Sequence, residues 1–345
     1  MVSTTNSVNT NKLGLTLNEY KGGASTMCDG CGHDAISSQI IKAYYDLGIE
    51  PHTVVKLSGI GCSSKTPAYF LGKAHAINAV HGRMPSVATG VNAANKQMRL
   101  IGVSGDGDSA SIGLGQLCHL IRRNINMVYI VENNGVYGLT KGQFSATADL
   151  GSKLKNGVIN DLPAIDICGL ALELGCGFVA RSFAGDPKQL SPLIKAAMSY
   201  NGLAILDVIS PCVTFNNHEG STKSYKYAKD AEIPLQELGF IPYFEQITVD
   251  YEPGTTTDVE MHDGSHLRLK KLDRNYDPFN RQSALNTILD AKEKGEFLTG
   301  LLYLDEKRED FATLMNTVDK PLSALTSEEL RPSKDVLNKI MAQLK

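Results

Sequence analysis

Two segments of the chain decide the fold: LIGVSGDG at residues 100–107 and MVYIVENN at residues 127–134. Each is a short apolar run that ends in turn-forming residues, which is the pattern of a buried strand that stops at a loop. Between them, residues 113–123 have the pattern of a helix. This order of strand, helix and strand predicts part of a parallel sheet.

Further segments of both kinds flank this unit. Expected helices cover residues 36–44, 88–98, 165–174 and 187–199, and expected strands cover residues 53–57, 178–180 and 203–209. Apolar strands of this length, separated by helices, predict an α/β protein with a parallel sheet flanked by helices on both faces.

The expected organisation has three parts. Residues 1–19 form a polar tail, and residues 20–240 form the α/β domain. Beyond about residue 225 the charge density rises and isolated helices are expected at residues 282–294 and 333–344. Residues 241–345 are therefore interpreted as a C-terminal extension that wraps the core or contacts a partner.

Composition excludes several functional classes. The chain has 345 residues, 42% of them hydrophobic, and a formal net charge of -3, which leaves no basic surface for nucleic acid. No apolar run approaches the roughly 18 residues of a membrane span, and the polar N-terminus does not resemble a signal peptide. We therefore expect a cytoplasmic protein, in which the seven cysteines indicate metal binding or catalysis more than disulfides.

Gly105-Asp106-Gly107 and Asn133-Asn134 each follow one of the two deciding strands. Glycines let the backbone approach a phosphate closely, and a following helix points its N–H groups at the anion. Magnesium prefers oxygen ligands, which Asp106, the Asn134 side chain and the backbone carbonyl of Val136 can supply. Gly-Asp-Gly alone is a common turn. The pair at successive strand ends is far more specific and predicts a metal–diphosphate site.

Four cysteines occupy loops at the ends of expected elements: Cys28, Cys31, Cys62 and Cys212. Four thiolates suit either tetrahedral zinc or a [4Fe–4S] cluster, and their spacing does not separate the two. A neighbouring cofactor that generates a carbanion favours the redox cluster. The other three cysteines, Cys118, Cys168 and Cys176, are interpreted as small buried hydrophobic residues.

With both sets in view, residues 20–240 resemble the β subunit of 2-oxoacid:ferredoxin oxidoreductases, which bind thiamine diphosphate. The motifs that carry the resemblance are Cys28-Asp29-Gly30-Cys31-Gly32-His33, Gly59-Ile60-Gly61-Cys62, His81-Gly82-Arg83, Gly105-Asp106-Gly107-Asp108, Asn133-Asn134-Gly135-Val136-Tyr137-Gly138, Thr140-Lys141-Gly142-Gln143 and Ser210-Pro211-Cys212. Asp29 departs from the family, which often has proline there, although this is not a ligand position.

The resemblance implies the cofactors and their ligands. Cys28, Cys31, Cys62 and Cys212 would hold one [4Fe–4S] cluster. Asp106, Asn134 and Val136 would hold Mg²⁺ on thiamine diphosphate, and Leu139 would lie against the substrate and the thiazolium ring. The implied reaction is oxidative decarboxylation of a 2-oxoacid with coenzyme A, giving acyl-CoA and CO₂ and reducing ferredoxin.

The resemblance also implies a partner subunit. In related enzymes a glutamate from a separate domain activates the thiamine, and this chain is too short to contain that domain beside its own. Glu132 lies on the diphosphate side of the motif and is a poor candidate. An α subunit is therefore expected to supply the glutamate and most coenzyme A contacts.

Two lysines bear on the choice of 2-oxoacid. Lys65 follows Cys62 by three residues, and Lys141 lies in the turn after the magnesium loop. Either ammonium would pair with the distal carboxylate of 2-oxoglutarate, which is the preferred substrate. Alternatively both are solvated loop residues or bind phosphate, and the enzyme is of the pyruvate type. His81 is expected near the diphosphate or the substrate carboxylate.

Two other functions compete with this interpretation. A non-redox thiamine-diphosphate decarboxylase or carboligase would use Asp106 and Asn134 but has no need of four thiolates. A zinc-stabilised binding module would use the cysteines and leave Gly105-Asp106-Gly107 as an incidental turn.

Overall fold

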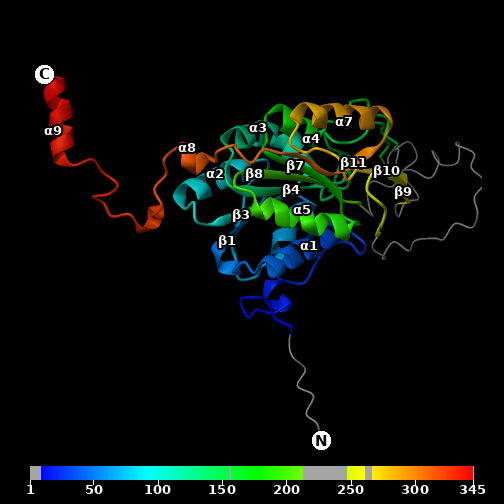
Figure 1. Cartoon of the computed structure of the whole chain (residues 1–345), viewed down its shortest axis with the longest axis horizontal. Coiled ribbons are helices and arrows are strands. Elements are labelled where there is room, and N and C mark those ends of the chain that lie inside the picture. Colours follow the sequence, from blue (N-terminus) through cyan, green and yellow to red (C-terminus); the bar gives the residue numbers. More distant parts are fainter. Residues whose placement is uncertain (1–8, 155–156, 213–246, 261–265, 345) are drawn as a thin grey trace, which may run out of the picture.

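The computed structural model describes residues 9–154, 157–212, 247–260 and 266–344. Its main feature is a nine-stranded sheet in the order β2-β1-β3-β4-β8-β7-β11-β10-β9 (Figure 1). A separate two-stranded ribbon pairs β5 (Val136–Tyr137) with β6 (Gln143–Phe144).

Six strands of the sheet run parallel to one another, five of them at segments where the sequence predicts strands; β2 was not predicted. They are β1 (Val54–Ser58), β2 (His75–Asn78), β3 (Arg99–Gly105), β4 (Met127–Asn133), β7 (Phe178–Phe183) and β8 (Leu203–Ile209). Their carboxyl ends therefore meet along one edge of the sheet, where α/β proteins bind ligands.

Three more strands extend the sheet beyond β7. β11 (Phe297–Leu304) is antiparallel to β7, β10 (His266–Lys271) is parallel to β11, and β9 (Thr256–Glu260) is antiparallel to β10. The sheet is thus mixed but mostly parallel. These three strands, part of the expected extension, belong to the sheet, whereas the expected boundary at residue 240 lies outside the described residues.

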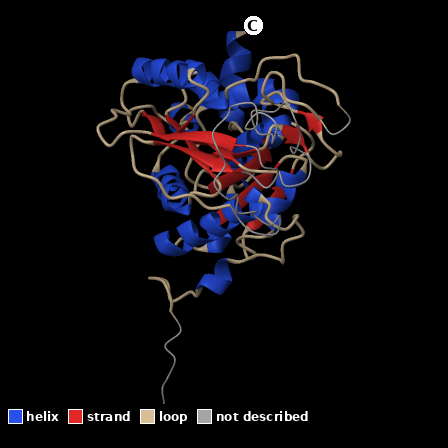
Figure 2. Ribbon diagram, turned by 90° about the vertical axis from the view of Figure 1, so that its right-hand side faces the viewer, coloured by secondary structure: helices blue, strands red, loops and turns tan. Residues whose placement is uncertain are grey.

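Helices cover both faces of the sheet, which confirms the predicted α/β class (Figure 2). One face carries α1 (Gly32–Leu47) and α5 (Pro187–Ser199), whose apolar residues pack with Ile101 and Ile130. The opposite face carries α2 (Met84–Ala94), α3 (Leu114–Arg123), α4 (Ile167–Glu173) and α7 (Arg281–Glu293). Successive strand residues point to opposite faces, so Tyr129 and Ile130 of β4 enter different cores.

Local sequence signals mark the helix ends. α5 begins with Pro187 directly after Asp186, whose side chain accepts the N–H of Gln189 at 3.1 Å. α1 ends at Gly48, which has a left-handed backbone with φ of 55°. That conformation costs glycine little and suits the residue that ends a helix.

The C-terminal part of the chain leaves the body. After α8 (Phe311–Leu314) it continues through a short turn, η5 (Leu322–Ala324), to α9 (Lys334–Gln343), which stands apart in Figure 1. None of the helices in the described ranges is both long enough and apolar enough to cross a membrane.

Candidate cofactor and metal site

A pocket lies at the carboxyl ends of the parallel strands, where the sequence predicts the ligand site. Cys62 follows β1, Asp106 follows β3, and Asn134 and Val136 follow β4; all four line this pocket. Gly105 and Gly107 line it as well. The fold therefore brings the two halves of the predicted metal–diphosphate motif together.

Asp106 and Asn134 are in direct contact. The backbone N–H of Asn134 donates to Oδ1 of Asp106 at 3.2 Å, and the side-chain oxygen of Asn134 accepts the N–H of Val136 at 3.1 Å. Asp106 is 1% exposed, and this burial raises the pKa of its carboxyl group. A buried carboxylate beside an amide oxygen is a donor set that fits a hard divalent cation such as Mg²⁺.

Two residues that the sequence analysis missed hold the Asp106 carboxylate. Thr147 Oγ1 donates to Oδ2 at 2.7 Å, and Ser145 Oγ donates to the same oxygen. Both lie about forty residues from Asp106 in the chain, at separations of 41 and 39 residues. No local pattern around Asp106 signals them, because only the folded chain brings them close.

The aromatic ring of Tyr137 lies so close to Gly107 that it leaves no room for a side chain there. A Cβ atom at this position would lie 2.4 Å from Cε1 of Tyr137, closer than any real contact. The Tyr137 hydroxyl in turn donates to the carbonyl of Gly107 at 3.1 Å. The second glycine of Gly-Asp-Gly thus lets Tyr137 pack across the loop.

Asp108 connects the loop that contains His81 to β3 through hydrogen bonds. Its Oδ1 accepts the N–H of Gly82 at 2.8 Å, and its Oδ2 accepts the hydroxyl of Ser104 at 2.8 Å. His81 itself lines the pocket, as expected of a residue near the diphosphate or substrate. Asp108 therefore has a positioning role that the sequence analysis did not assign.

The residues expected to contact substrate differ in their placement. Leu139 lines the pocket and is 52% exposed, so it lies at the pocket's open side. Lys65 is half-buried in the short helix η3 (Cys62–Ala68), and Lys141 is exposed in a left-handed turn with φ of 76°. Neither lysine is among the residues that line the pocket.

The four expected ligand cysteines gather at the same edge of the sheet. The N–H of Cys31 donates to the carbonyl of Cys28 at 3.1 Å, and that of Gly32 donates to the carbonyl of Pro211, next to Cys212, at 3.3 Å. Burial raises the pKa of the Cys31 and Cys62 thiols, and the nearby Cys212 adds to both shifts. The loop of Cys28 and Cys31 thus lies beside Cys212, with Cys62 within electrostatic reach.

Within the described ranges, no group of three or more His, Cys, Asp or Glu side chains is arranged to hold a single metal ion. Four thiolates at one edge of the sheet suit either tetrahedral zinc or a [4Fe–4S] cluster, as the sequence analysis stated. Cys168 and Cys176 are fully buried in the apolar core, as predicted, whereas Cys118 is only partly buried.

Glu132 lies between the pocket and the cysteine loops. It is fully buried at the end of β4, and burial raises the pKa of its carboxyl well above the ordinary range. Thr66 Oγ1 donates to its Oε2 at 2.9 Å, and Nδ1 of His33 lies 3.6 Å from the same oxygen. Glu132 also lines the pocket, whereas its contacts with Thr66 and His33 had no signal in the sequence.

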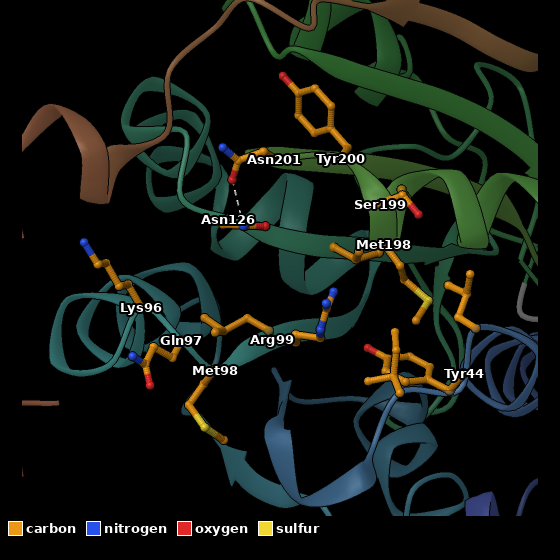
Figure 3. A pocket seen from close by; sticks show the side chains of 15 residues that line it. Tyr44, Lys96, Gln97, Met98, Arg99, Asn126, Met198, Ser199, Tyr200 and Asn201 are labelled. Atoms are coloured by element: carbon orange, nitrogen blue, oxygen red, sulfur yellow. Dashed lines mark hydrogen bonds between the residues drawn. The ribbon is translucent and has the colours of Figure 1, made fainter. Parts of the chain in front are cut away.

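A larger cavity of about 420 Å³ lies at the opposite edge of the sheet, where β3 and β4 begin (Figure 3). Lys96, Arg99 and Tyr44 line it, and Asn126 donates to Asn201 across its rim at 2.9 Å. It contains none of the residues predicted for the cofactor site.

The comparisons with known proteins agree with this geometry. A family described as "Thiamine pyrophosphate enzyme, C-terminal TPP binding domain" matches residues 59–208. That span begins directly after β1, contains the Asp106–Asn134 contact and runs into β8, so the fold and site belong to the class of thiamine-diphosphate-binding domains.

Named relatives assign the chain to one family within the thiamine-diphosphate-binding class. The chain is 43% identical over 202 residues to the "2-oxoacid:ferredoxin oxidoreductase subunit beta" of Saccharolobus solfataricus, covering 57% of this chain and 65% of the relative. It is 34% identical over 215 residues to the "2-oxoglutarate synthase subunit KorB" of Methanocaldococcus jannaschii, covering 61% of this chain and 79% of the relative. The chain belongs to the family of 2-oxoacid:ferredoxin oxidoreductase β subunits.

A solved structure extends the likeness to nearly the whole chain. The "2-oxoglutarate:ferredoxin oxidoreductase from Magnetococcus marinus with 2-oxoglutarate, coenzyme A and succinyl-CoA bound" superposes with a TM-score of 0.72 at 27% identity, covering 96% of each chain. The sequence matches are shorter, and the match to the Saccharolobus relative spans 65% of that protein's length.

Proposed function

We propose that this chain is the β subunit of an enzyme that oxidatively decarboxylates 2-oxoglutarate with coenzyme A and passes the electrons to ferredoxin. The observation that carries the proposal is the shared edge of the sheet. The buried Asp106–Asn134 contact lines a pocket that Cys62 and His33 also line, and the loop of Cys28 and Cys31 is hydrogen-bonded to the segment of Cys212 beside it. A non-redox thiamine enzyme has no use for these cysteines.

The proposed cofactors divide between the two parts of the site. Asp106, the Asn134 side chain and the Val136 carbonyl hold Mg²⁺ on the diphosphate, and the four cysteines hold one [4Fe–4S] cluster. Bound together, these groups supply carbanion chemistry at the 2-oxoacid carbon and a route for the released electrons. The protein's part is to fix the groups in place and to keep water from the buried carboxylate of Asp106.

A partner α subunit is part of the proposal. Leu139 is 52% exposed at the pocket's open side, so the pocket is accessible to a second chain. That chain supplies the glutamate that activates thiamine and most contacts to coenzyme A. We also propose a cytoplasmic location, because the cluster needs its cysteines in the reduced thiolate form.

The C-terminal extension is proposed to contact the same partner. α9 presents Leu337 and Ile340 to solvent, 55% and 49% exposed. An apolar stripe on a helix outside the body is typical of a helix that packs on another chain.

The preference for 2-oxoglutarate rests on positive charge near the pocket. Lys65 lies on η3, which begins at the pocket-lining Cys62, and Lys141 follows the pocket-lining Thr140. Either ammonium binds the distal carboxylate of 2-oxoglutarate, and His81 binds the carboxylate next to its keto group. The solved relative with 2-oxoglutarate bound supports this choice. Pyruvate is the alternative outcome.

The test is an anaerobic co-expression of this chain with its α subunit. Iron, acid-labile sulfide, thiamine diphosphate and zinc are measured, together with ferredoxin reduction on 2-oxoglutarate and on pyruvate with coenzyme A. We expect a brown protein with iron and sulfide in equal amounts and faster reduction with 2-oxoglutarate. A colourless zinc protein would favour a structural module, and a colourless thiamine protein a decarboxylase.

Matched variants separate the two cofactors. Asp106→Asn is expected to lose thiamine diphosphate and to keep iron, whereas Cys31→Ser is expected to lose iron and to keep thiamine diphosphate. Asp258→Asn is the control, since this carboxylate pairs with Arg268 on the surface. Loss of both cofactors in the control would show that the assay reports folding alone.

A further inference from the structure

Glu132 is the common neighbour of two side chains that come from different cysteine-bearing segments. Thr66 lies on η3, four residues after Cys62, and donates to Oε2 of Glu132 at 2.9 Å. Nδ1 of His33, two residues after Cys31, lies 3.6 Å from that same oxygen, just beyond hydrogen-bond range.

The third segment joins through His33. Its Nδ1 is 2.6 Å from Oγ of Ser210, which lies two residues before Cys212. The same segment packs closely against the start of α1, because a Cβ atom on Gly32 would lie 2.6 Å from Ser210 Oγ. Glu132, Thr66, His33 and Ser210, here the Glu132 network, therefore connect the loops of Cys31, Cys62 and Cys212.

The network is anchored to the rigid part of the sheet. Glu132 belongs to β4, which pairs along its length with β3 and β8. The N–H of Ser210 donates to the carbonyl of Asn133 at 2.7 Å, which fixes this end of β8 to β4. Loops have few restraints of their own, so their positions depend on such anchors.

Water does not reach the network. Glu132, Thr66 and Ser210 are fully buried and His33 is 2% exposed. Oε1 of Glu132 is buried as well and has no hydrogen-bond partner among the described residues. A buried carboxyl group is costly, and apolar residues of similar size fill such a position more cheaply. Its presence here indicates a role other than stability.

We propose that Glu132 is a positioning residue, which holds the segments of Cys31, Cys62 and Cys212 in the arrangement that the iron–sulfur cluster needs. This inference rests on the proposed function, since it concerns the proposed cluster. Residues that orient metal ligands contribute strongly to metal retention even though they never touch the metal. Glu132 acts through Thr66 and His33, each of which is close in sequence to a ligand cysteine.

The experiment compares four variants of the anaerobically co-expressed complex. Glu132→Ala removes the shared acceptor, Glu132→Gln keeps an acceptor of the same shape, and Thr66→Val removes one donor with little change in volume. Ser191→Ala is the matched control, because this buried hydroxyl on α5 has no hydrogen-bond partner among the described residues. The readouts are the EPR spectrum of the reduced protein, the midpoint potential, and the rate of bleaching by EDTA.

We expect Glu132→Ala to bleach about tenfold faster than wild type and to show an altered EPR line shape. Glu132→Gln should restore most of the wild-type behaviour, Thr66→Val should fall between, and Ser191→Ala should match wild type. The melting temperature and thiamine diphosphate content serve as checks on folding. If Glu132→Ala does not fold, Thr66→Val carries the test.

Two results would overturn the inference in distinguishable ways. A brown wild-type protein whose Glu132→Ala and Thr66→Val variants match Ser191→Ala in EPR spectrum and bleaching rate would remove the positioning role and leave the proposed function intact. A wild-type protein without iron and sulfide would remove the proposed function and this inference with it.

Discussion

The N–H of Asn134 lies 3.2 Å from Oδ1 of Asp106, and this single contact joins the ends of β3 and β4 at the candidate metal site. The two residues are 28 positions apart in the chain. β3 and β4 are adjacent and parallel, so the sheet itself fixes their separation. The predictions below follow from this site and from the elements that support it.

Thr147 is expected to tune the metal site without binding the metal. Its hydroxyl donates to Asp106 at 2.7 Å and lies 3.0 Å from the side-chain oxygen of Asn133. Thr147→Val should weaken the affinity for thiamine diphosphate with Mg²⁺ by about tenfold, because the carboxylate loses an orienting donor. Titration followed by protein fluorescence measures this. Thr287→Val on α7 should leave the affinity unchanged.

Gly107→Ala is expected to impair cofactor binding by displacing Tyr137. The added methyl group would lie 2.4 Å from the Tyr137 ring, so the ring or the loop has to move. Overpacking of this kind costs about 1–3 kcal/mol. Adding Tyr137→Leu should recover much of the lost stability in thermal unfolding. A double variant no more stable than Gly107→Ala would disprove this steric explanation.

Arg181 is expected to be essential for stability. Its guanidinium donates to Asp207 at 2.9 Å and to Asp166 at 2.7 Å, and Asp207 is 1% exposed. Arg181→Met leaves a buried carboxylate without its cation and should cost about 3–5 kcal/mol in urea unfolding. Lys188→Met, which breaks an exposed pair with Asp250, should leave the stability close to that of wild type, because exposed pairs contribute little.

The same cluster predicts a loss of stability in acid. Burial alone would raise the pKa of Asp166, but the Arg181 charge and the hydrogen bonds from Gly169 and Arg181 together outweigh it, and the pKa is lowered from 3.8. A depressed carboxyl pKa stabilises the fold above the unfolded-state value, and this contribution disappears as the pH falls through the folded-state value. Unfolding free energy should therefore fall below about pH 4. In Asp166→Asn this part of the fall should be absent.

Lys56 predicts that the fold gains stability as the pH rises in the basic range. Its ammonium is buried in β1, where it donates to the carbonyls of Pro67 and Phe70 at 2.7 and 2.8 Å, and burial lowers its pKa from 10.5 to about 8. Between these values the unfolded chain binds more protons, so stability rises with pH. The stability of wild type relative to Lys56→Met should therefore increase from pH 8 to pH 10. A constant difference would contradict this assignment.

The sequence was sufficient for the sheet core and for the meeting of Asp106 and Asn134 at one edge of the sheet, for a physical reason. Buried parallel strands are continuous apolar runs, and residues that follow adjacent parallel strands necessarily meet at one edge. Asp106, Asn134 and Cys62 could therefore be placed together before any contact was known. The helices at residues 32–47 and 187–199 were recognisable from their apolar spacing and, for the second, from Asp186-Pro187.

Other features had no local signal. Ser145, Thr147 and Thr66 are ordinary polar residues until the fold brings them to Asp106 and Glu132. β9 and β10 lie in charged, Thr- and Lys-rich sequence and are half-exposed, so they lack the apolar run of a buried strand. Their pairing depends on β11, which continues the sheet in the antiparallel direction beyond β7.

Cys28 is exposed, whereas Cys31 and Cys62 are partly covered by the chain. In the proposed enzyme one corner of the cluster would therefore reach the protein surface. Electrons would have a short exit to a docked carrier at that corner. Molecular oxygen would arrive by the same opening, so speed of electron delivery and sensitivity to air would be two results of one placement.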